Sequence, residues 1–435
     1  MNSASAAPAV PIERGYPALS VQVRIVALMF ALSAMSYFDR VVMSIAGPGI
    51  MRDFGISETR MGWIFSAALF AYMVFMGPGG ALADRFGGRM VLTISGLGVA
   101  LFTGLTSICG PTGLGALLGV VPAFILMRVA FGICAAPLYP STSRIAEAWI
   151  PPVQQARAQA VIMSGAAVGS ATAPVLFSRL IGSFGWPIAF WVAGGMTTVL
   201  ILMWFLWIRD RPSGRSAALS TEPRAPQAGI PWGRLLKDRN LLLLTGAYFM
   251  LNYFEYIFYY WIYYYFAEIR HMKEQSAMAT TWLFITMAVM TPLGGWVTDL
   301  MVKRFGLRKG KRIVPIAAMA SSAVLLSVGA SGLGLFGTVA LLSLAVGCSM
   351  APEGAFWSTA IHMGGRQVGA ACGIMNTGGN IGGALAPILT PLIASRFGWA
   401  GGLYFACGLV LLGMLAWFFI DASHVVEEQP AEAAR

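Results

Sequence analysis

Long apolar runs follow one another along most of the chain, separated by short polar stretches. An α-helix needs about 20 predominantly apolar residues to cross the hydrocarbon core of a bilayer. Twelve segments have this length and character: 24–49, 61–82, 90–110, 118–139, 158–182, 187–208, 240–266, 277–300, 313–333, 335–361, 368–392 and 399–420. The pattern therefore predicts an all-α membrane protein with twelve transmembrane helices.

The composition supports this prediction and divides the chain. Of the 435 residues, 57% are hydrophobic and 11% are charged, whereas soluble domains have about 25% charged residues. A polar, basic and proline-containing segment separates the first six apolar runs from the last six, as expected of a linker. No charged segment followed by a short apolar run opens the chain, so we expect no signal peptide. The predicted parts are an N-terminal tail (1–23), a six-helix bundle (24–208), a linker (209–239), a second six-helix bundle (240–420) and a C-terminal tail (421–435).

Basic residues are distributed unevenly between the two sides of the predicted helices. If the N-terminus is cytoplasmic, the cytoplasmic side holds 21 of the 29 lysines and arginines and the opposite loops hold six. This asymmetry predicts a multi-pass protein of the cell (inner) membrane with both termini in the cytoplasm. The net charge of +11 then faces anionic lipid, and no nucleic-acid partner is needed to explain it.

The two halves of the sequence resemble each other. The segment GSATAPVLFSRLIGSFGW (169–186) aligns without gaps on GGALAPILTPLIASRFGW (382–399), at an offset of 213. Three further residues, Gly132, Pro137 and Asp84, recur at an offset of 215 as Gly347, Pro352 and Asp299. Such a repeat predicts two pseudo-symmetric bundles that rock around a site near the membrane midplane, as in a transporter. The same repeat could also build a rigid receptor.

Several motifs carry a resemblance to a known family. The loop GALADRFGGR (80–89), with a weaker copy in GGWVTDLMVKRFGLRKGKR (294–312), resembles the signature between helices 2 and 3 of the major facilitator superfamily. Within that superfamily, YFDR on the first helix and MRVAFGICAAPLYPS on the fourth resemble the anion:cation symporter family. The resemblance implies the major facilitator fold and transport of an organic anion such as a sugar acid, usually with protons.

The loop signature also implies a charged latch, or gate, on the cytoplasmic side. A carboxylate at a helix end can pair with basic groups and cap neighbouring helix termini. The basic residues could instead act only as topological stop signals. The latch residues are Asp84, Arg85, Arg89, Asp299 and Arg304.

The resemblance further implies site residues. It assigns the substrate carboxylate to Arg40 and Arg128, the lining of the site to Tyr37 and Tyr72, a polar contact to Asn380, and proton coupling to Asp39. Three positions depart from the family pattern: Ala135 replaces the usual glutamate on the fourth helix, Met76 replaces a glutamine, and Ala166 replaces a polar residue. The usual proton carrier is therefore missing.

The charged residues in the first half support an anionic ligand on their own. Arg40 and Arg128 are the only basic side chains deep in the apolar runs, where a charge costs about 2.5 to 3.5 kcal/mol. Neighbours three or four residues from Asp39 and Arg40 are uncharged, so their partners must lie on other helices, on a ligand or in water. An arginine fork matches a carboxylate. The alternative is a structural pair between Arg128 and Asp39.

The second half contains two acids within apolar runs, Glu255 and Glu353, and no matching base. A buried carboxyl without a base takes up a proton readily, so both are candidates for proton coupling; Glu353 could equally be structural. Eight of the thirteen tyrosines lie between 248 and 265. We assign the outer ones, with Trp261, to a membrane-interface belt and the inner ones to the site. Further substrate-site candidates are Tyr253, Tyr256, Tyr260, Asn376 and Trp357.

The sequence argues against an enzyme. It shows no Ser/His/Asp set, no His/Cys metal cluster and no phosphate-binding glycine loop in a soluble domain, and the five cysteines lack metal-ligand spacing. We therefore expect no catalytic residues, metal or cofactor. The expected partners are a small organic anion, protons and the lipid bilayer, and the expected state is a monomer. The alternatives are a proton-coupled antiporter that exports drugs, and an uncoupled uniporter or exchanger.

Overall fold

The structure is a computed structural model that describes residues 18–209, 232–331, 333–365 and 368–426, with a few side chains left out. Most of the predicted tails and linker lie outside these residues. The helices are α1 (Leu19–Phe54), α2 (Glu58–Phe86), α3 (Gly88–Leu105), η1 (Thr106–Ile108), α4 (Leu114–Leu118), α5 (Val120–Ala135), α6 (Leu138–Trp149), α7 (Pro152–Phe184), α8 (Trp186–Trp207), α9 (Trp232–Leu235), α10 (Arg239–Tyr260), α11 (Ile262–Tyr264), the π-helical turn η3 (Tyr265–Ile269), α12 (Ser276–Ala330), α13 (Leu335–Met350), α14 (Glu353–Gly364) and α15 (Val368–Phe419).

The structure contains the predicted twelve membrane-crossing helices. In the described part of the chain, ten continuous spans are long and apolar enough to cross a membrane. Two of them, α12 and α15, are each two helices joined at a non-helical glycine, Gly306 and Gly398. The fourth and tenth spans are interrupted at Pro137 and Pro352, which are equivalent positions of the repeat, because a proline cannot donate the backbone hydrogen bond of a continuous helix.

Some helices extend beyond their predicted ends. The fourth span was predicted to end at residue 139, but α6 continues it to Trp149, and α7 begins at Pro152 rather than at residue 158. The added turns contain polar residues such as Arg144 and Gln154. Hydropathy detects only the apolar part of a helix, so it misses turns that project beyond the hydrocarbon core.

Two equivalent glycines allow the first helix of each half to pack closely against the fifth. A Cβ atom on Gly169 of α7 would lie 1.9 Å from the Ala34 carbonyl oxygen of α1, and one on Gly382 of α15 would lie 2.1 Å from the Phe249 carbonyl oxygen of α10. These distances exclude any side chain without a helix shift. The repeat seen in the sequence is thus a repeat of backbone packing.

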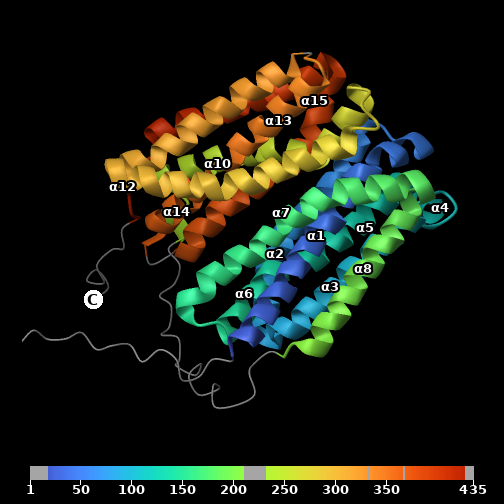
Figure 1. Cartoon of the computed structure of the whole chain (residues 1–435), viewed down its shortest axis with the longest axis horizontal. Coiled ribbons are helices and arrows are strands. Elements are labelled where there is room, and N and C mark those ends of the chain that lie inside the picture. Colours follow the sequence, from blue (N-terminus) through green and yellow to red (C-terminus); the bar gives the residue numbers. More distant parts are fainter. Residues whose placement is uncertain (1–17, 210–231, 332, 366–367, 427–435) are drawn as a thin grey trace, which may run out of the picture.

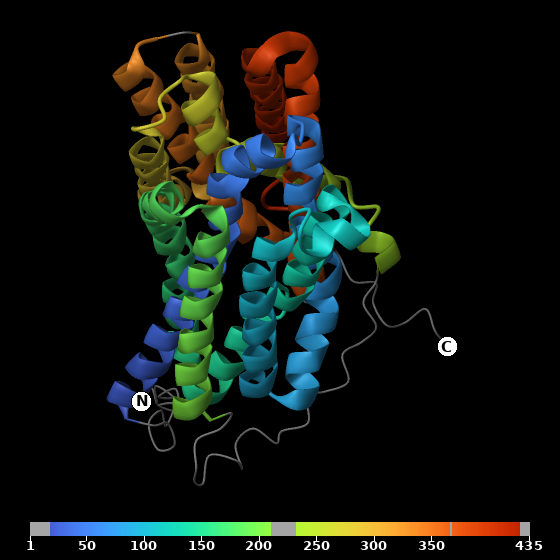
Figure 2. The same cartoon turned by 90° about the vertical axis from the view of Figure 1, so that its right-hand side faces the viewer.

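The two halves form separate bundles that meet at one end. Figure 1 shows the first half (blue to green) and the second half (yellow to red) as two inclined bundles that converge at the upper right and diverge toward the left. The view turned by 90° also shows two distinct bundles (Figure 2). The contacts between halves come chiefly from α2 against α15 and from α7 against α12.

The convergent end is held by close contacts that we call the seam: Gly62, Ser66 and Glu58 of the first half with Pro387, Ala384, Tyr264 and Trp399 of the second. A Cβ on Gly62 would lie 2.1 Å from the Pro387 carbonyl oxygen. Ser66 Oγ donates to the Ala384 carbonyl at 2.6 Å, and Tyr264 and Trp399 Nε1 donate to Glu58 Oε1. The seam lies beside the Phe54 end of α1 and the bend of α15 at Gly398. Both places are remote from Leu19 and Phe419, so the halves close on the side opposite these two residues.

Candidate functional site

Arg40 lies between the two halves, among tyrosine rings. Tyr37 precedes it by three residues on α1 and therefore shares its helix face. The Arg40 guanidinium carbon lies 4.7 Å from the Tyr37 ring centroid and 5.2 Å from that of Tyr72 on α2. Tyr256 and Tyr260 of α10 are close enough to interact with it electrostatically. Arg40 is 7% exposed, so these four tyrosines lie around a buried cation.

Arg128 on α5 is the second cation of this site. It is fully buried, and its guanidinium carbon lies 4.3 Å above the Phe131 ring. None of its three guanidinium nitrogens has a hydrogen-bond partner, and neither does the buried hydroxyl of nearby Tyr260. A buried charge without hydrogen bonds is costly. In the part of the chain that the structure describes, no group accepts a hydrogen bond from these donors.

Asp39 faces the interior of its own half, away from Arg40. Adjacent helical residues project about 100° apart. Thr197 Oγ1 of α8 donates to Asp39 Oδ2 at 2.7 Å, while Oδ1 has no hydrogen-bond partner. Arg128 is near enough to interact electrostatically, but no ion pair within 4.0 Å joins the two among the described residues. The alternative of a direct structural pair is therefore not formed in this structure.

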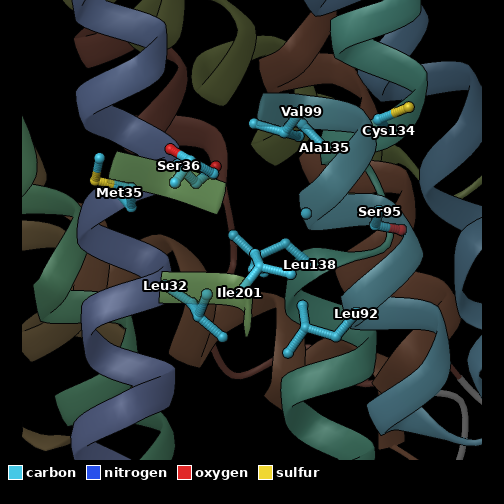
Figure 3. Close-up of a pocket in the computed structure, with 12 residues that line it drawn as sticks. Leu32, Met35, Ser36, Leu92, Ser95, Val99, Cys134, Ala135, Leu138 and Ile201 are labelled. Carbon is cyan, nitrogen blue, oxygen red and sulfur yellow. The ribbon is translucent and has the colours of Figure 1, made fainter. Parts of the chain in front are cut away.

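A cavity lies inside the first half (Figure 3). Thr197, the hydrogen-bond donor to Asp39, is part of its wall, and so is Ala135, the position that departs from the family pattern. The other wall residues come from α1, α3, α5, α6 and α8: Leu32, Met35, Ser36, Leu92, Ser95, Gly96, Val99, Cys134, Leu138 and Ile201. A longer side chain at position 135 thus has space beside it.

Two carboxyl groups lie close together in the second half. Glu353 opens α14 directly after Pro352, and its Oε2 accepts from Tyr248 Oη at 3.2 Å and from Trp357 Nε1 at 3.0 Å. Glu255 of α10 is 3% exposed, has one unpartnered oxygen, and is near enough to Glu353 to interact with it. No lysine, arginine or histidine forms an ion pair with either acid in the described part of the chain. The two acids form a group of their own.

The other predicted site residues are distributed over the second half. Tyr253 lies apart from Arg40: its hydroxyl is 3.3 Å from Thr390 Oγ1 and its ring packs against Phe405. Asn380 donates to the Asn376 carbonyl at 2.8 Å within α15. The structure thus groups Tyr37, Tyr72, Tyr256 and Tyr260 around Arg40, and places Trp357 beside Glu353.

The sequence analysis missed Thr197, and it assigned the aromatic residues that follow α10 to the wrong environment. Thr197 is one of two adjacent threonines in an apolar helix, and the pattern does not reveal which faces Asp39. The predicted interfacial belt is wrong for Trp261 and Tyr265, because both are buried. Trp261 Nε1 donates to the Pro387 carbonyl at 3.1 Å and its ring contacts Phe65 of α2. These aromatic residues close the site on the side of the seam.

The predicted cytoplasmic latch is only partly described. The side chain of Asp84 lies outside the described residues, whereas Arg85, Asp299 and Arg304 are exposed. Arg89 donates to the Phe205 carbonyl at 2.6 Å, within its own half. A cross-half latch remains a prediction.

A charged contact within the second half lies beyond the end of α15. Arg308 Nε lies 3.4 Å from Asp421 Oδ2. Hydrogen bonds from the Ser423 hydroxyl and N–H lower the pKa of Asp421. This carboxylate therefore stays ionised beside the arginine.

Comparison with known proteins agrees with this architecture. The family model of the Major Facilitator Superfamily matches residues 29–370 and 273–435. The chain belongs to this superfamily and is a multi-pass membrane transporter, not an enzyme.

Two curated relatives extend over nearly the whole chain. The hexuronate transporter of Bacillus subtilis (strain 168) is 27% identical over 404 residues, which cover 90% of this chain and 93% of the relative. A probable sulfoacetate transporter of Cupriavidus necator is 27% identical over 423 residues, covering 94% and 96%. Among solved structures, a bacterial homologue of the lysosomal transporter Spinster, in an inward-facing and occupied conformation, has a TM-score of 0.76 at 15% identity, over 93% of this chain and 97% of that one. The two curated relatives are both named for the transport of an organic anion.

Proposed function

We propose that the protein imports an organic anion, a sugar acid or a related carboxylate, by proton symport with alternating access. The observation that carries the proposal is the pair Arg40 and Arg128, two buried cations that lie against aromatic rings and form no ion pair among the described residues. An arginine fork binds a carboxylate through two parallel hydrogen bonds. The relatives named for hexuronate and sulfoacetate support the same class of substrate.

The closed seam suggests the direction in which the site opens. We place both termini in the cytoplasm of a cell-membrane protein, on the strength of the basic-residue asymmetry. The seam then faces the outside, and the structure is an inward-facing state. Since one chain contains both bundles and the whole site between them, we expect a monomer to transport.

The three buried acids are the candidates for proton coupling. We favour Asp39, because it lies within electrostatic reach of Arg128, so that a bound anion and a proton act on the same local charge. Glu353, with Glu255 beside it, lies in the opposite half. Protonation would remove a buried charge and so favour the movement of one half against the other. A drug-exporting antiporter could use the same acids, but Arg40 and Arg128 would repel a cationic substrate.

Transport by the purified protein in proteoliposomes tests this proposal. We expect radiolabelled glucuronate or sulfoacetate to enter, and to accumulate when the outside is more acidic than the inside. Counterflow exchange, which needs no net proton movement, serves as the control for intact substrate binding. Binding without uptake would indicate a receptor. Uptake that ignores the pH gradient would indicate a uniporter or exchanger and would overturn the symport proposal.

A further inference from the structure

The site contains two separate arginine forks, and each is positioned by aromatic rings. Arg40 on α1 is stacked against Tyr37 and Tyr72, and Arg128 on α5 is stacked against Phe131. A ring face attracts a guanidinium but leaves its N–H groups free to donate. One carboxylate has two oxygens and is occupied by a single fork in the bidentate geometry. Two forks therefore match two anionic groups.

The charges near the two arginines also indicate two anionic groups on the substrate. Among the described residues, Asp39 is the only acid that interacts with Arg128, and the two are further apart than an ion pair. The groups that surround Arg40 are tyrosines. When Asp39 carries a proton, the site has two positive charges, and none of the described residues neutralises either. A monoanion would leave one buried cation uncompensated, which is unfavourable in a medium of low dielectric constant.

We propose that the substrate is a dianion, a short dicarboxylate or a carboxylate with a second anionic group, and that each anionic group binds one of the two arginines. This inference rests on the proposed function, because it assumes that Arg40 and Arg128 meet the substrate. Tyr256 and Tyr260 interact electrostatically with Arg40, and Tyr260 also interacts with Arg128, so their hydroxyls can donate to hydroxyl groups between the two charges. Charge number, rather than sugar structure, then determines selectivity.

Position 135 allows the charge of the site to be changed by one. Ala135 follows Arg128 by two helical turns on the same face of α5. It lines the cavity in Figure 3, whose wall also includes Thr197. The cavity gives a longer side chain room. Ala135→Glu should add a negative charge near Arg128, while Ala135→Gln adds nearly the same volume without the charge.

Isothermal titration calorimetry on the full-length protein in lipid nanodiscs tests the inference without requiring transport. D-gluconate and D-glucarate share a six-carbon polyol chain and differ in whether one end is an alcohol or a carboxylate. Butyrate and succinate repeat this difference without hydroxyls. We expect each dianion to bind about tenfold tighter or more than its monoanion, because a hydrogen bond to a charged group contributes on that scale.

Variants of the site test whether its charge determines the preference for dianions over monoanions. Arg40→Gln and Arg128→Gln should each reduce the dianion-to-monoanion affinity ratio toward one, Ala135→Glu should reduce it as well, and Ala135→Gln should leave it unchanged. Equal or tighter binding of gluconate than glucarate by the unmodified protein would overturn the dianion inference and leave organic-anion transport standing. An unchanged ratio in Ala135→Glu would also contradict it. If none of the four acids binds, the proposed function fails and this inference fails with it.

Discussion

The two halves of the protein share a backbone framework and carry opposite charges on it. Gly169 presses against Ala34 in the first half just as Gly382 presses against Phe249 in the second. This pairing of Ala34 with Phe249 makes Glu255 the counterpart of Arg40, because each lies six residues further along its helix. At this equivalent position the first half thus has a base where the second half has an acid.

The comparison separates what the fold requires from what transport requires. Close packing of neighbouring helices needs a glycine in both halves, because any side chain would meet a carbonyl oxygen. Binding an anion needs arginine forks on one side only. We infer that the first half is specialised for the anion, with Asp39 as the favoured proton carrier beside it, and that the second half contributes further carboxyl groups to proton coupling.

The largest effect should follow from removing the fully buried cation of the first half. Arg128→Gln should reduce both uptake and counterflow more than Arg128→Lys does, because it removes an anchor of the anion. Arg128→Lys keeps the charge but loses the planar fork, so the apparent affinity should fall about tenfold to 100-fold. Counterflow at varied substrate concentration measures this. Unchanged apparent affinity in Arg128→Lys would remove Arg128 from the substrate site.

Neutralising the acids should separate coupling from binding. We expect counterflow to persist in Glu255→Gln, Glu353→Gln and Asp39→Asn, since exchange needs no net proton movement. A variant that lacks a coupling acid should lose the accumulation that a pH gradient drives. Measuring both assays on each variant identifies the carrier. If all three variants still accumulate substrate against its gradient, none of these acids carries the proton, and the division between the halves is wrong.

The shared framework predicts matching losses of stability. Gly169→Ala and Gly382→Ala each place a methyl group within about 2 Å of a carbonyl oxygen, so each should destabilise its half by about 1 to 3 kcal/mol through overpacking. Thermal unfolding in detergent, followed by tryptophan fluorescence, compares them. Gly195→Ala, at a position with open space around the added Cβ, is the control. A loss in only one half would show that the halves are packed differently.

The smallest effect concerns the hydrogen bond that holds Asp39. Thr197→Val removes the donor 2.7 Å from Asp39 Oδ2, while Thr197→Ser retains a hydroxyl. Because that donor stabilises the ionised carboxylate, Thr197→Val should move the pH of half-maximal uptake upward by less than about one unit, with little change in counterflow. An identical pH profile in Thr197→Val and the unmodified protein would exclude Asp39 from proton coupling.

Much of the fold could be predicted because its signals are local. Apolar runs determine the twelve spans, and the glycines and prolines of the repeat mark equivalent packing and break points. The polar ends of α6 and α7 escaped prediction because they project beyond the apolar runs. Side-chain direction was harder: the sequence does not show that Tyr253 turns toward Thr390 or that Trp261 is buried against Pro387. Both depend on how α10 is rotated against α15, which only tertiary packing decides.

The same limit applies to the charged residues. Their identity indicated an anion site, and helical geometry predicted that Asp39 and Arg40 face different partners. The grouping of Arg40 with Tyr256 and Tyr260 from the other half, and of Glu255 with Glu353, requires the arrangement of helices distant in sequence.

The central claim is that an organic anion and a proton cross together, and proton movement tests it most directly. Proteoliposomes without any imposed gradient are given unlabelled anion while the pH of a weakly buffered external medium is recorded. We predict that the external pH rises as protons enter with the anion, and that Arg128→Gln reduces the rise. Uptake of labelled anion with no change in external pH would contradict the account.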